Sequence, residues 1–588
     1  MKILIEGHKY QTDFIEKNRR LAIWGKEGKT DLIGYFYSHD LKDCVFILPK
    51  VILNEDGKIF DSFSPEDIWN VKLFDKDSVL RREQHDFLFR FSIWIYQSIN
   101  VYNRLNRYNG IVQEETILDI DTSTENARVS YLDILLALVR FADDNRNFLL
   151  FKMSNMQNKS GKVNWQRTVS HKQPVFSRKK IPIYLNPIIK RKDIDYEEEL
   201  LVIYFSILHY IDVKYGFKTQ INANFDLIKD KEFESYLNGA GLVRLQAIKY
   251  KYFSDTTLKI WSLCNYFFMQ SGEINSSHYS KDFLLTSTYN KVFEAMVDFL
   301  IGEPQEDLPK HISKAQKDGK EIDHLFRFNS LIDYNLTTFY IADSKYYKTE
   351  DVKDMKGTSL FKQFTYARNL LQDDLQWRIA HPSWGKEYFL CRDDLTEGYN
   401  IIPNYFLSAY MDSSLRYDTD GIKRREEIHK VFHFSNRLFD RETLLLSHYD
   451  INFLFVVKQY ANLYKNVKFR DNVRKIFRED MLDYLNDNYL FYTLTLRDKP
   501  SPGKERDYLE KAITPIFRYV NGKIICPSKD LSFATLLLAL ENPDRIGSKT
   551  KKECVISENN LVFDIVDKVF TRKEHILGKP IVGTVFEY

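Results

Sequence analysis

The sequence is poor in the residues that cross-link or interrupt a fold. It has 5 cysteines, 15 prolines, 22 glycines and 7 tryptophans among 588 residues. The cysteines are scattered and none forms a CxxC pair, which excludes a disulfide framework and a cysteine-based zinc site. So little proline and glycine excludes a collagen-like or low-complexity chain. Scattered cysteines fit a reducing compartment, and we therefore expect a cytoplasmic protein.

Long hydrophobic runs and a large net charge are also lacking. The longest apolar stretches, such as 200–211, are too short to cross a bilayer, and charge interrupts the amino terminus too early for a secretory signal. The 85 Lys and Arg residues against 82 Asp and Glu residues leave a charge of +3. No global field therefore draws the chain to a membrane or to nucleic acid, so any polyanion site has to be local.

What remains is typical of folded domains, with 44% hydrophobic and 28% charged residues. The length predicts about four domains of roughly 150 residues each. Short apolar runs separated by turn signals predict a β-rich domain over 1–75, and apolar residues at three- and four-residue steps predict a helical region over 76–280. Mixed helix and strand patterns follow over 281–470, and an α/β accessory region closes the chain over 471–588. The expected fold class is a multidomain α+β protein.

One segment departs sharply from the even charge balance. Between 157 and 192 there are ten basic residues and no acidic ones, with Trp165, Phe176 and Tyr184 interleaved. Lysine and arginine bind phosphates, and aromatic rings stack on bases. We interpret the segment as a DNA-contact region rather than a solvated loop. Its predicted contacts are Lys159, Lys162, Arg167, Lys172, Arg178, Lys179, Lys180, Lys190, Arg191 and Lys192.

The order of patterns between 281 and 371 is the most informative feature. Apolar residues at helical spacing over 286–303 predict a helix that carries Glu294. Alternating residues over 322–328 and 338–347 predict two strands, and a second helix pattern follows them. Acidic and basic side chains recur along this order, which makes it the candidate catalytic segment.

Two residues of the second strand define the candidate chemistry. Asp343 and Lys345 are two positions apart, so the strand period of 2 places both side chains on one face of the sheet. Asp323 comes close to Asp343 if the two strands pair. Carboxylates bind a hard cation such as Mg²⁺, and a lysine offsets charge developing at phosphorus. Together they suit metal-dependent phosphodiester hydrolysis, with Glu294 as a possible further ligand.

The helix after the second strand adds polar side chains to this region. Lys362, Gln363 and Tyr366 lie at adjoining helical positions, where they are expected to contact the DNA backbone or to order the catalytic lysine. The first aspartate has competitors, because Asp318 and Asp333 flank Asp323 within the same stretch.

The order of helix with Glu294, strand with Asp323, and strand with Asp343-x-Lys345 resembles the PD-(D/E)xK nuclease superfamily. Within it, the segments VFEAMVDFLIGE, YIADSKYYK and SLFKQFTYARNLL are similar to LlaJI-type restriction endonucleases and to the related McrC nuclease subunits. Outside this region CVFILPKVIL, VNWQRTV and HFSNRLFDRETLLLSHYDINFLFVVKQYA are similar to segments of LlaJI-type proteins. The resemblance thus extends over much of the chain.

The resemblance implies a restriction-endonuclease-like mixed-sheet core over 281–470 and a Mg²⁺-dependent DNA endonuclease, with Mn²⁺ able to substitute. It implies metal ligation by Asp323 and Asp343, an auxiliary acid in Glu294 and a catalytic Lys345. In this sequence Ile322 replaces the proline that often precedes the first aspartate. The implied setting is a bacterial restriction system for phage defence.

The chain is not expected to bind a nucleotide itself. Gly28-Lys29-Thr30 supplies the end of a Walker A motif, but Ile23 stands where its first glycine belongs. The likeness to McrC instead implies a McrB-like AAA+ GTPase partner, and a companion DNA methyltransferase fits the same setting. The rival hypothesis is a non-catalytic DNA-binding or assembly subunit that leaves cutting to a partner.

Overall fold

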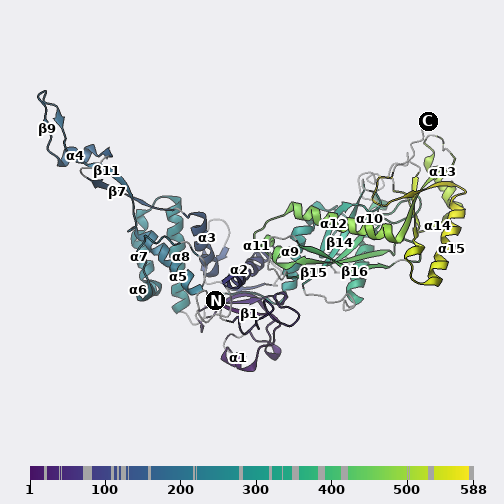
Figure 1. Ribbon diagram of the computed structural model, residues 1–588, viewed down its shortest axis with the longest axis horizontal. Helices are drawn as coiled ribbons and strands as arrows, with labels where there is room; N and C mark the ends of the chain where they lie inside the picture. Colours follow the sequence, from purple (N-terminus) through teal and green to yellow (C-terminus); the bar gives the residue numbers. More distant parts are fainter. Residues whose placement is uncertain are drawn as a thin grey trace. The chain divides into compact units, whose positions relative to one another are not determined.

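The computed structural model describes residues 1–581 (Figure 1), apart from 19–20, 22, 39, 42, 70–81, 107–111, 116–117, 121–126, 130, 147, 157–160, 216–218, 220, 277–282, 317–320, 334–335, 347–356, 382–390, 412–420, 433, 499–500, 502 and 528–534. The chain divides into two compact units. Unit 1 comprises Met1–Leu48, Phe63–Ser92 and Gly110–Thr286, and unit 2 comprises Pro49–Ser62, Ile93–Asn109 and Ser287–Tyr588. Each unit mixes helices with sheets, which confirms the α+β class.

The amino-terminal part of unit 1 is built on a five-stranded sheet, two of whose strands come from beyond the expected β-rich stretch 1–75. The strand order is β1 (Lys2–Ile5), β3 (Asp43–Leu48), β2 (Ile33–Ser38), β12 (Phe283–Thr286) and β4 (Val112–Glu115). The chain passes very close to itself at Gly34, whose φ is +136°, because a Cβ there would collide with the carbonyl oxygen of Leu284. Glycine is therefore required where β12 joins the sheet.

Helices account for most of the rest of unit 1. They are α3 (Tyr131–Asp144), α5 (Glu199–Tyr215), α6 (Asp230–Ser235), α7 (Gly241–Ile248) and α8 (Asp255–Ser276). Aromatic residues dominate their core: Phe233 and Phe267 both pack against Phe268, and Tyr204 donates a hydrogen bond of 3.2 Å to the Leu138 carbonyl. The region expected to be helical also contains the short strands β5 (Leu118–Ile120) and β6 (Ala127–Val129).

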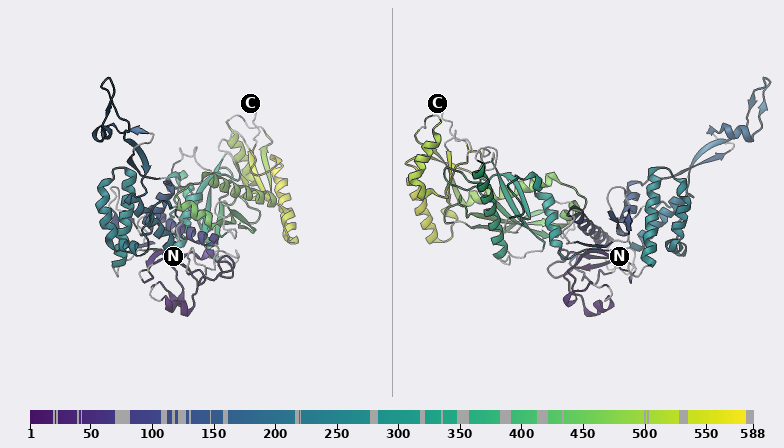
Figure 2. Two further views of the ribbon diagram at one scale, coloured as in Figure 1. Left: turned by 60° about the vertical axis from the view of Figure 1, so that its left-hand side comes forward. Right: turned by 180° about the vertical axis from the view of Figure 1, so that it is seen from behind.

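An arm, residues 151–194, projects away from these helices in every view (Figures 1 and 2). Its stem is the antiparallel pair β7 (Phe151–Met156) and β11 (Ile189–Ile194), which β8 (Lys162–Val163) extends. Its outer part holds α4 (Trp165–His171) and the hairpin of β9 (Val175–Phe176) and β10 (Pro182–Ile183). Large apolar side chains, including Trp165, Phe176 and Leu185, lie exposed along it.

Unit 2 is organised around a mixed five-stranded sheet. The strand order is β13 (His324–Asn329), β14 (Thr337–Lys345), β15 (Pro403–Tyr410), β17 (Leu444–Asn452) and β16 (Ile422–Phe432). β14, β15 and β17 run parallel, and the outer strands are antiparallel to them. β14 is rich in threonine, aromatic and isoleucine residues and is buried along nearly its whole length, because helices cover both of its faces.

One face of this sheet packs on α10 (Gly357–Ala380). Leu325, Phe339 and Ile341 from β13 and β14 form a core with Tyr366 and Leu370 of the helix. Because side chains alternate along a strand, residues 343 and 345 lie on the same face as residue 341. The first turns of α10 therefore lie near the end of β14.

The opposite face packs on α9 (Tyr289–Ile301), α11 (Phe453–Ala461) and α12 (Val467–Asn488). Phe477 of α12 stacks on Tyr405 with ring centroids 4.4 Å apart. Arg474 donates hydrogen bonds to the carbonyls of Ile301 and Gly302, where α9 ends. This fork satisfies the carbonyls at that helix end, and it thereby fixes the helix that carries Glu294.

A second sheet closes unit 2, with the order β19 (Ile524–Ile525), β20 (Thr535–Glu541), β18 (Tyr489–Leu496) and β21 (Phe570–His575). The helices α13 (Glu505–Ile513), α14 (Phe517–Val520) and α15 (Lys549–Val566) contribute to its core through Leu509, Val520 and Val562. Helix α2 (Arg82–Leu105) begins within unit 1 and ends within unit 2. Among the described residues, no helix has the length and apolar character needed to cross a membrane.

Candidate active site

Two aspartates meet at one end of the unit 2 sheet. β13 pairs with β14 so that His324 lies opposite Ala342, which sets Asp323 opposite Asp343, as the sequence predicts if the strands pair. The backbone N–H of Ser344 donates a hydrogen bond of 3.2 Å to Oδ2 of Asp323. Only 5% of the Asp323 side chain and 1% of the Asp343 side chain are exposed. Two carboxylates are thus held together away from bulk water.

Two lysines contact these carboxylates from different elements. Lys345, on the same face of β14, forms an ion pair with Oδ2 of Asp343. Lys362, on α10, lies 3.3 Å from Oδ1 of Asp343 and 3.8 Å from Oδ1 of Asp323, measured from its Nζ. The same-face placement of Asp343 and Lys345 is confirmed. Lys362 bridges the aspartates, a contact that helical spacing alone did not predict.

Burial and the crowding of acidic groups together perturb the pKa of Asp323. Burial, and next the negative charges of Asp343 and Glu294, raise the pKa of Asp323 to about 8. Burial lowers the pKa of Lys362, but the attraction of Asp323 and Asp343 outweighs burial and the pKa is raised. A buried carboxyl whose pKa is raised by burial and by neighbouring acidic groups is typical of functional sites.

A third acidic residue reaches this region from α9. Glu294 influences the pKa of Asp323, and it pairs with Lys291, whose Nζ lies 2.6 Å from Oε2 of Glu294. Although burial lowers the pKa of Lys291, the hydrogen bond to Glu294 and the charges of Glu294 and Asp323 raise it. Sequence reasoning missed Lys291. The signal was its i,i+3 spacing to Glu294, which places both residues on one side of the helix.

Gln363 and Tyr366, the other two predicted residues of α10, lie at the same end of this helix as Lys362. The Tyr366 hydroxyl donates a hydrogen bond to the Glu321 carbonyl, just before Asp323 in the chain. Gln363 is fully buried, and neither polar atom of its amide has a hydrogen-bond partner within the described residues. A buried amide without partners is costly, so this position favours a polar ligand or neighbour.

The other face of β14 carries a second polar set. His324 is buried between Ser344, with which its Nε2 shares a hydrogen bond, and Asp298, 3.4 Å from its Nδ1. Lys314 lies 2.7 Å from Oδ2 of Asp298. Ser344 stands between Asp343 and Lys345 in β14, so these contacts hold the strand from the face opposite the two aspartates.

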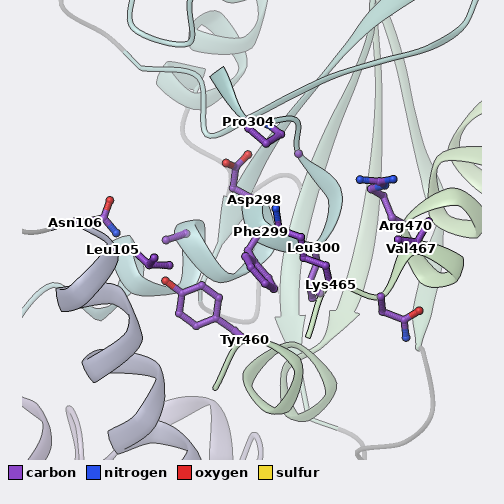
Figure 3. A pocket seen from close by; sticks show the side chains of 13 residues that line it. Leu105, Asn106, Asp298, Phe299, Leu300, Pro304, Tyr460, Lys465, Val467 and Arg470 are labelled. Carbon is purple, nitrogen blue, oxygen red and sulfur yellow. The ribbon is translucent and has the colours of Figure 1, made fainter. Parts of the chain in front are cut away.

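Asp298 also lines a pocket of about 260 Å³ in unit 2 (Figure 3). Phe299, Tyr460, Lys465 and Arg470 are among the other lining residues. None of the predicted catalytic or metal-binding residues lines it. The pocket is therefore separate from the aspartate pair.

The competing aspartates are placed differently. Asp333 lies in the turn between β13 and β14, where its carbonyl accepts a hydrogen bond from Leu336, at the strand ends remote from Asp343. Asp318 lies outside the described residues. Of the described candidates, Asp323 is the one that meets Asp343.

The chemistry of the aspartate pair fits a hard divalent cation. Mg²⁺ is usually held by one or two carboxylates together with waters and substrate phosphates. Oδ2 of Asp343 is buried and accepts no hydrogen bond from the described residues, although the Lys345 ammonium contacts it. Within the described ranges no three His, Cys, Asp or Glu side chains are arranged to hold a metal ion together. The donor set that fits a divalent cation is therefore the pair of Asp323 and Asp343.

The predicted DNA-contact residues lie on the arm, except for Lys159, which lies outside the described residues. Arg178, Lys179 and Lys180 are exposed on the loop that joins β9 to β10, where Lys180 has a φ of +56°. Arg191 pairs with Asp193 across 2.6 Å, and Lys192 lies over the Phe151 ring. The exposed aromatic and basic side chains thus gather on one projecting element.

Unit 2 thus combines a mixed sheet covered by helices on both faces with a strand end that carries acidic and lysine side chains. The sequence model of the LlaJI restriction endonuclease family matches residues 83–407, just over half of the chain. The chain belongs to the LlaJI restriction endonuclease family, whose members are DNA nucleases of restriction systems. The match includes the arm, Glu294, Asp323, Asp343, Lys345 and α10. No curated protein matches the chain.

Proposed function

We propose that this protein is a Mg²⁺-dependent DNA endonuclease that hydrolyses phosphodiester bonds with a metal-activated water. The observation that carries the proposal is the convergence of Asp323, Asp343, Lys345 and Lys362 at the end of β14. The family, a group of restriction endonucleases, supplies the substrate class. The core is proposed to be of the PD-(D/E)xK type, which the mixed sheet with helices on both faces supports.

Asp323 and Asp343 would hold the cation, and Mn²⁺ is expected to substitute for Mg²⁺. Bound there, the ion would lower the pKa of its water and polarise the phosphoryl oxygen. Glu294 would act as an auxiliary acid, joined to the site through water because Lys291 occupies its carboxylate. Asp323 must give up its proton before it can serve as a ligand, because ligands bind metal in the deprotonated state.

Lys345 would place its ammonium beside the reacting phosphate, where it offsets the negative charge that develops at phosphorus. Asp343 holds this ammonium in position through their ion pair, and the Phe406 ring lies 5.6 Å from its Nζ. Gln363 would donate its unpaired amide to a phosphate oxygen or to a bound water. Tyr366 would act indirectly, because its hydroxyl tethers the Glu321 carbonyl next to Asp323.

The arm is proposed to bind the DNA backbone and so to retain the substrate. Replacing Arg178, Lys179 and Lys180 together by alanine is expected to weaken DNA binding most at low salt. The slope of log K against log salt should fall by up to about 2.7, since each phosphate contact contributes roughly 0.9. Fluorescence anisotropy over a salt series measures this slope.

The matched control for the arm replaces three basic residues of α15, Lys549, Lys551 and Lys552, by alanine. This variant loses the same charge from unit 2, and its slope should equal that of the unaltered protein. Equal slopes for all three proteins would show that the tip of the arm does not touch DNA.

The proposed setting is a bacterial phage-defence restriction system in the cytoplasm. A McrB-like AAA+ GTPase is the proposed partner, with a companion DNA methyltransferase as a second component. Support comes from the family and from the failed nucleotide motif, in which Ile23 stands at the first glycine position. This chain would then cut DNA while its partner hydrolyses GTP.

The decisive experiment is cleavage of methylated and unmethylated plasmid by the purified protein in Mg²⁺ or Mn²⁺, alone and together with any AAA+ GTPase that a neighbouring gene encodes. Metal-dependent cutting that disappears in Lys345→Ala is the expected result. DNA binding without cutting in every combination would favour the non-catalytic DNA-binding or assembly subunit.

A further inference from the structure

Each acidic side chain of the candidate site is contacted by a lysine of the same chain. Lys291 pairs with Glu294 across 2.6 Å, and Lys345 pairs with Asp343. Lys362 spans Asp323 and Asp343, at 3.8 Å and 3.3 Å. The lysines come from three different elements, α9, β14 and α10, so their convergence is a property of the fold rather than of one local motif.

The lysines differ in how firmly they are held. The Lys345 side chain is 15% exposed and is wedged between its aspartate and the Phe406 ring. Lys362 is 34% exposed and Lys291 is 47% exposed, with flexible stems that reach toward solvent. The lysine end of each of these two pairs is in contact with solvent, although the aspartates are buried. Each ammonium group can therefore return to water when a divalent cation takes over its charge at the carboxylates.

We propose that Lys362, assisted by Lys291, is a built-in counter-cation that a divalent ion displaces and that then binds a DNA phosphate. The proposal rests on the proposed function only in taking the aspartate pair as the cation site. Mg²⁺ or Mn²⁺ on Asp323 and Asp343 would repel the Lys362 ammonium, which both carboxylates now attract. Released beside the ion, the ammonium is placed for a phosphate oxygen, so DNA affinity at the site is coupled to metal binding.

The proposed displacement of Lys362 by the metal and a purely structural role of Lys362 predict opposite effects on metal affinity when this lysine is removed. If Lys362 only held the carboxylates in place, its removal would weaken metal binding. If it competes with the metal, Lys362→Met should bind Mn²⁺ about three- to tenfold more tightly, the equivalent of losing one or two partly exposed ion pairs. Lys291→Met should change affinity in the same direction and by less, because it touches only the auxiliary acid.

Isothermal titration calorimetry with Mn²⁺ and the full-length protein tests this, without DNA and without activity as the readout. The control is Lys523→Met, which breaks the Lys523–Glu558 ion pair at the second sheet of unit 2. Its metal affinity should match that of the unaltered protein. Unchanged or weaker Mn²⁺ binding by Lys362→Met, or no Mn²⁺ binding by the unaltered protein, would overturn the exchange.

A second measurement covers the case in which Lys362→Met does not fold. Acylation of the unaltered protein by an amine-reactive reagent, followed by mass spectrometry, reports the accessibility of each lysine. Saturating Mn²⁺ should raise labelling of Lys362 at least twofold relative to Lys523. Equal labelling with and without metal would refute the displacement.

The two proposals can fail separately. If Lys362→Met binds Mn²⁺ more tightly but the unaltered protein cleaves no DNA, the exchange holds and the proposed nuclease activity is wrong. If the unaltered protein cleaves DNA but Lys362→Met has an unchanged Mn²⁺ affinity, only the exchange is wrong.

Discussion

Replacing Asp343 with asparagine is expected to lower the rate of metal-dependent DNA cleavage by about 10³-fold or more, since it removes a proposed metal ligand and the anchor of Lys345 together. The side chain keeps its size, and the loss of one charge relieves repulsion with Asp323. We therefore expect the fold to persist. Single-turnover cleavage of a labelled duplex measures the rate, and fluorescence anisotropy measures whether the variant binds DNA as the unaltered protein does.

The two competing aspartates are the matched controls for this prediction. Asp333→Asn changes a residue at the far ends of β13 and β14, and it should cleave DNA at nearly the unaltered rate. Asp318→Asn should behave in the same way. If either of these variants lost most of its cleavage activity while Asp323→Asn kept it, the altered residue, and not Asp323, would be the first metal ligand.

Metal affinity is expected to rise with pH up to about pH 8. The pKa of Asp323 is raised from 3.8 to about 8, so at pH 7 the metal-free protein carries this carboxyl mostly protonated. Because a bound cation requires the carboxylate, affinity should increase by up to about tenfold per pH unit between pH 6 and 8 and level off above. Calorimetry in two buffers of different ionisation enthalpy should show close to one proton released per ion at pH 7.

The same shift affects stability with a defined sign. The unfolded chain loses this proton near pH 3.8 and the folded protein near pH 8, so the contribution of Asp323 to stability is full below pH 3.8 and declines as pH rises to 8. Asp323→Asn should therefore unfold at a higher temperature than the unaltered protein at pH 8, while losing the pH dependence of metal binding. A pH-independent metal affinity in the unaltered protein would contradict the raised pKa.

The core of the candidate site could be predicted because it depends on local periods. A spacing of two residues on a strand places Asp343 and Lys345 on one face, and an antiparallel partner brings Asp323 opposite. The bridging position of Lys362 depends on how α10 crosses the strand end, which is a matter of packing. Helix period predicts which residues share a side, and it does not predict which strand that side meets.

The fold of unit 1 was less predictable for a related reason. Three strands at the amino terminus follow from short apolar runs separated by turn signals, but their fourth neighbour, β12, lies about 240 residues later in the chain. No local pattern encodes such a pairing. The strands of the arm were hard to predict for another reason. They are largely exposed, so no buried face requires apolar and polar residues to alternate along them.

The place of β12 in the sheet has a consequence for synthesis. β2 pairs with β3 on one side and with β12 on the other. During synthesis β1, β2 and β3 leave the ribosome long before Phe283–Thr286 is made. Until then one edge of β2 lacks the strand that pairs with it in the folded protein. An open strand edge is a template for wrong pairing. Newly made chains should therefore need protection of this edge during elongation, and fragments that end before residue 283 should aggregate where the full chain does not.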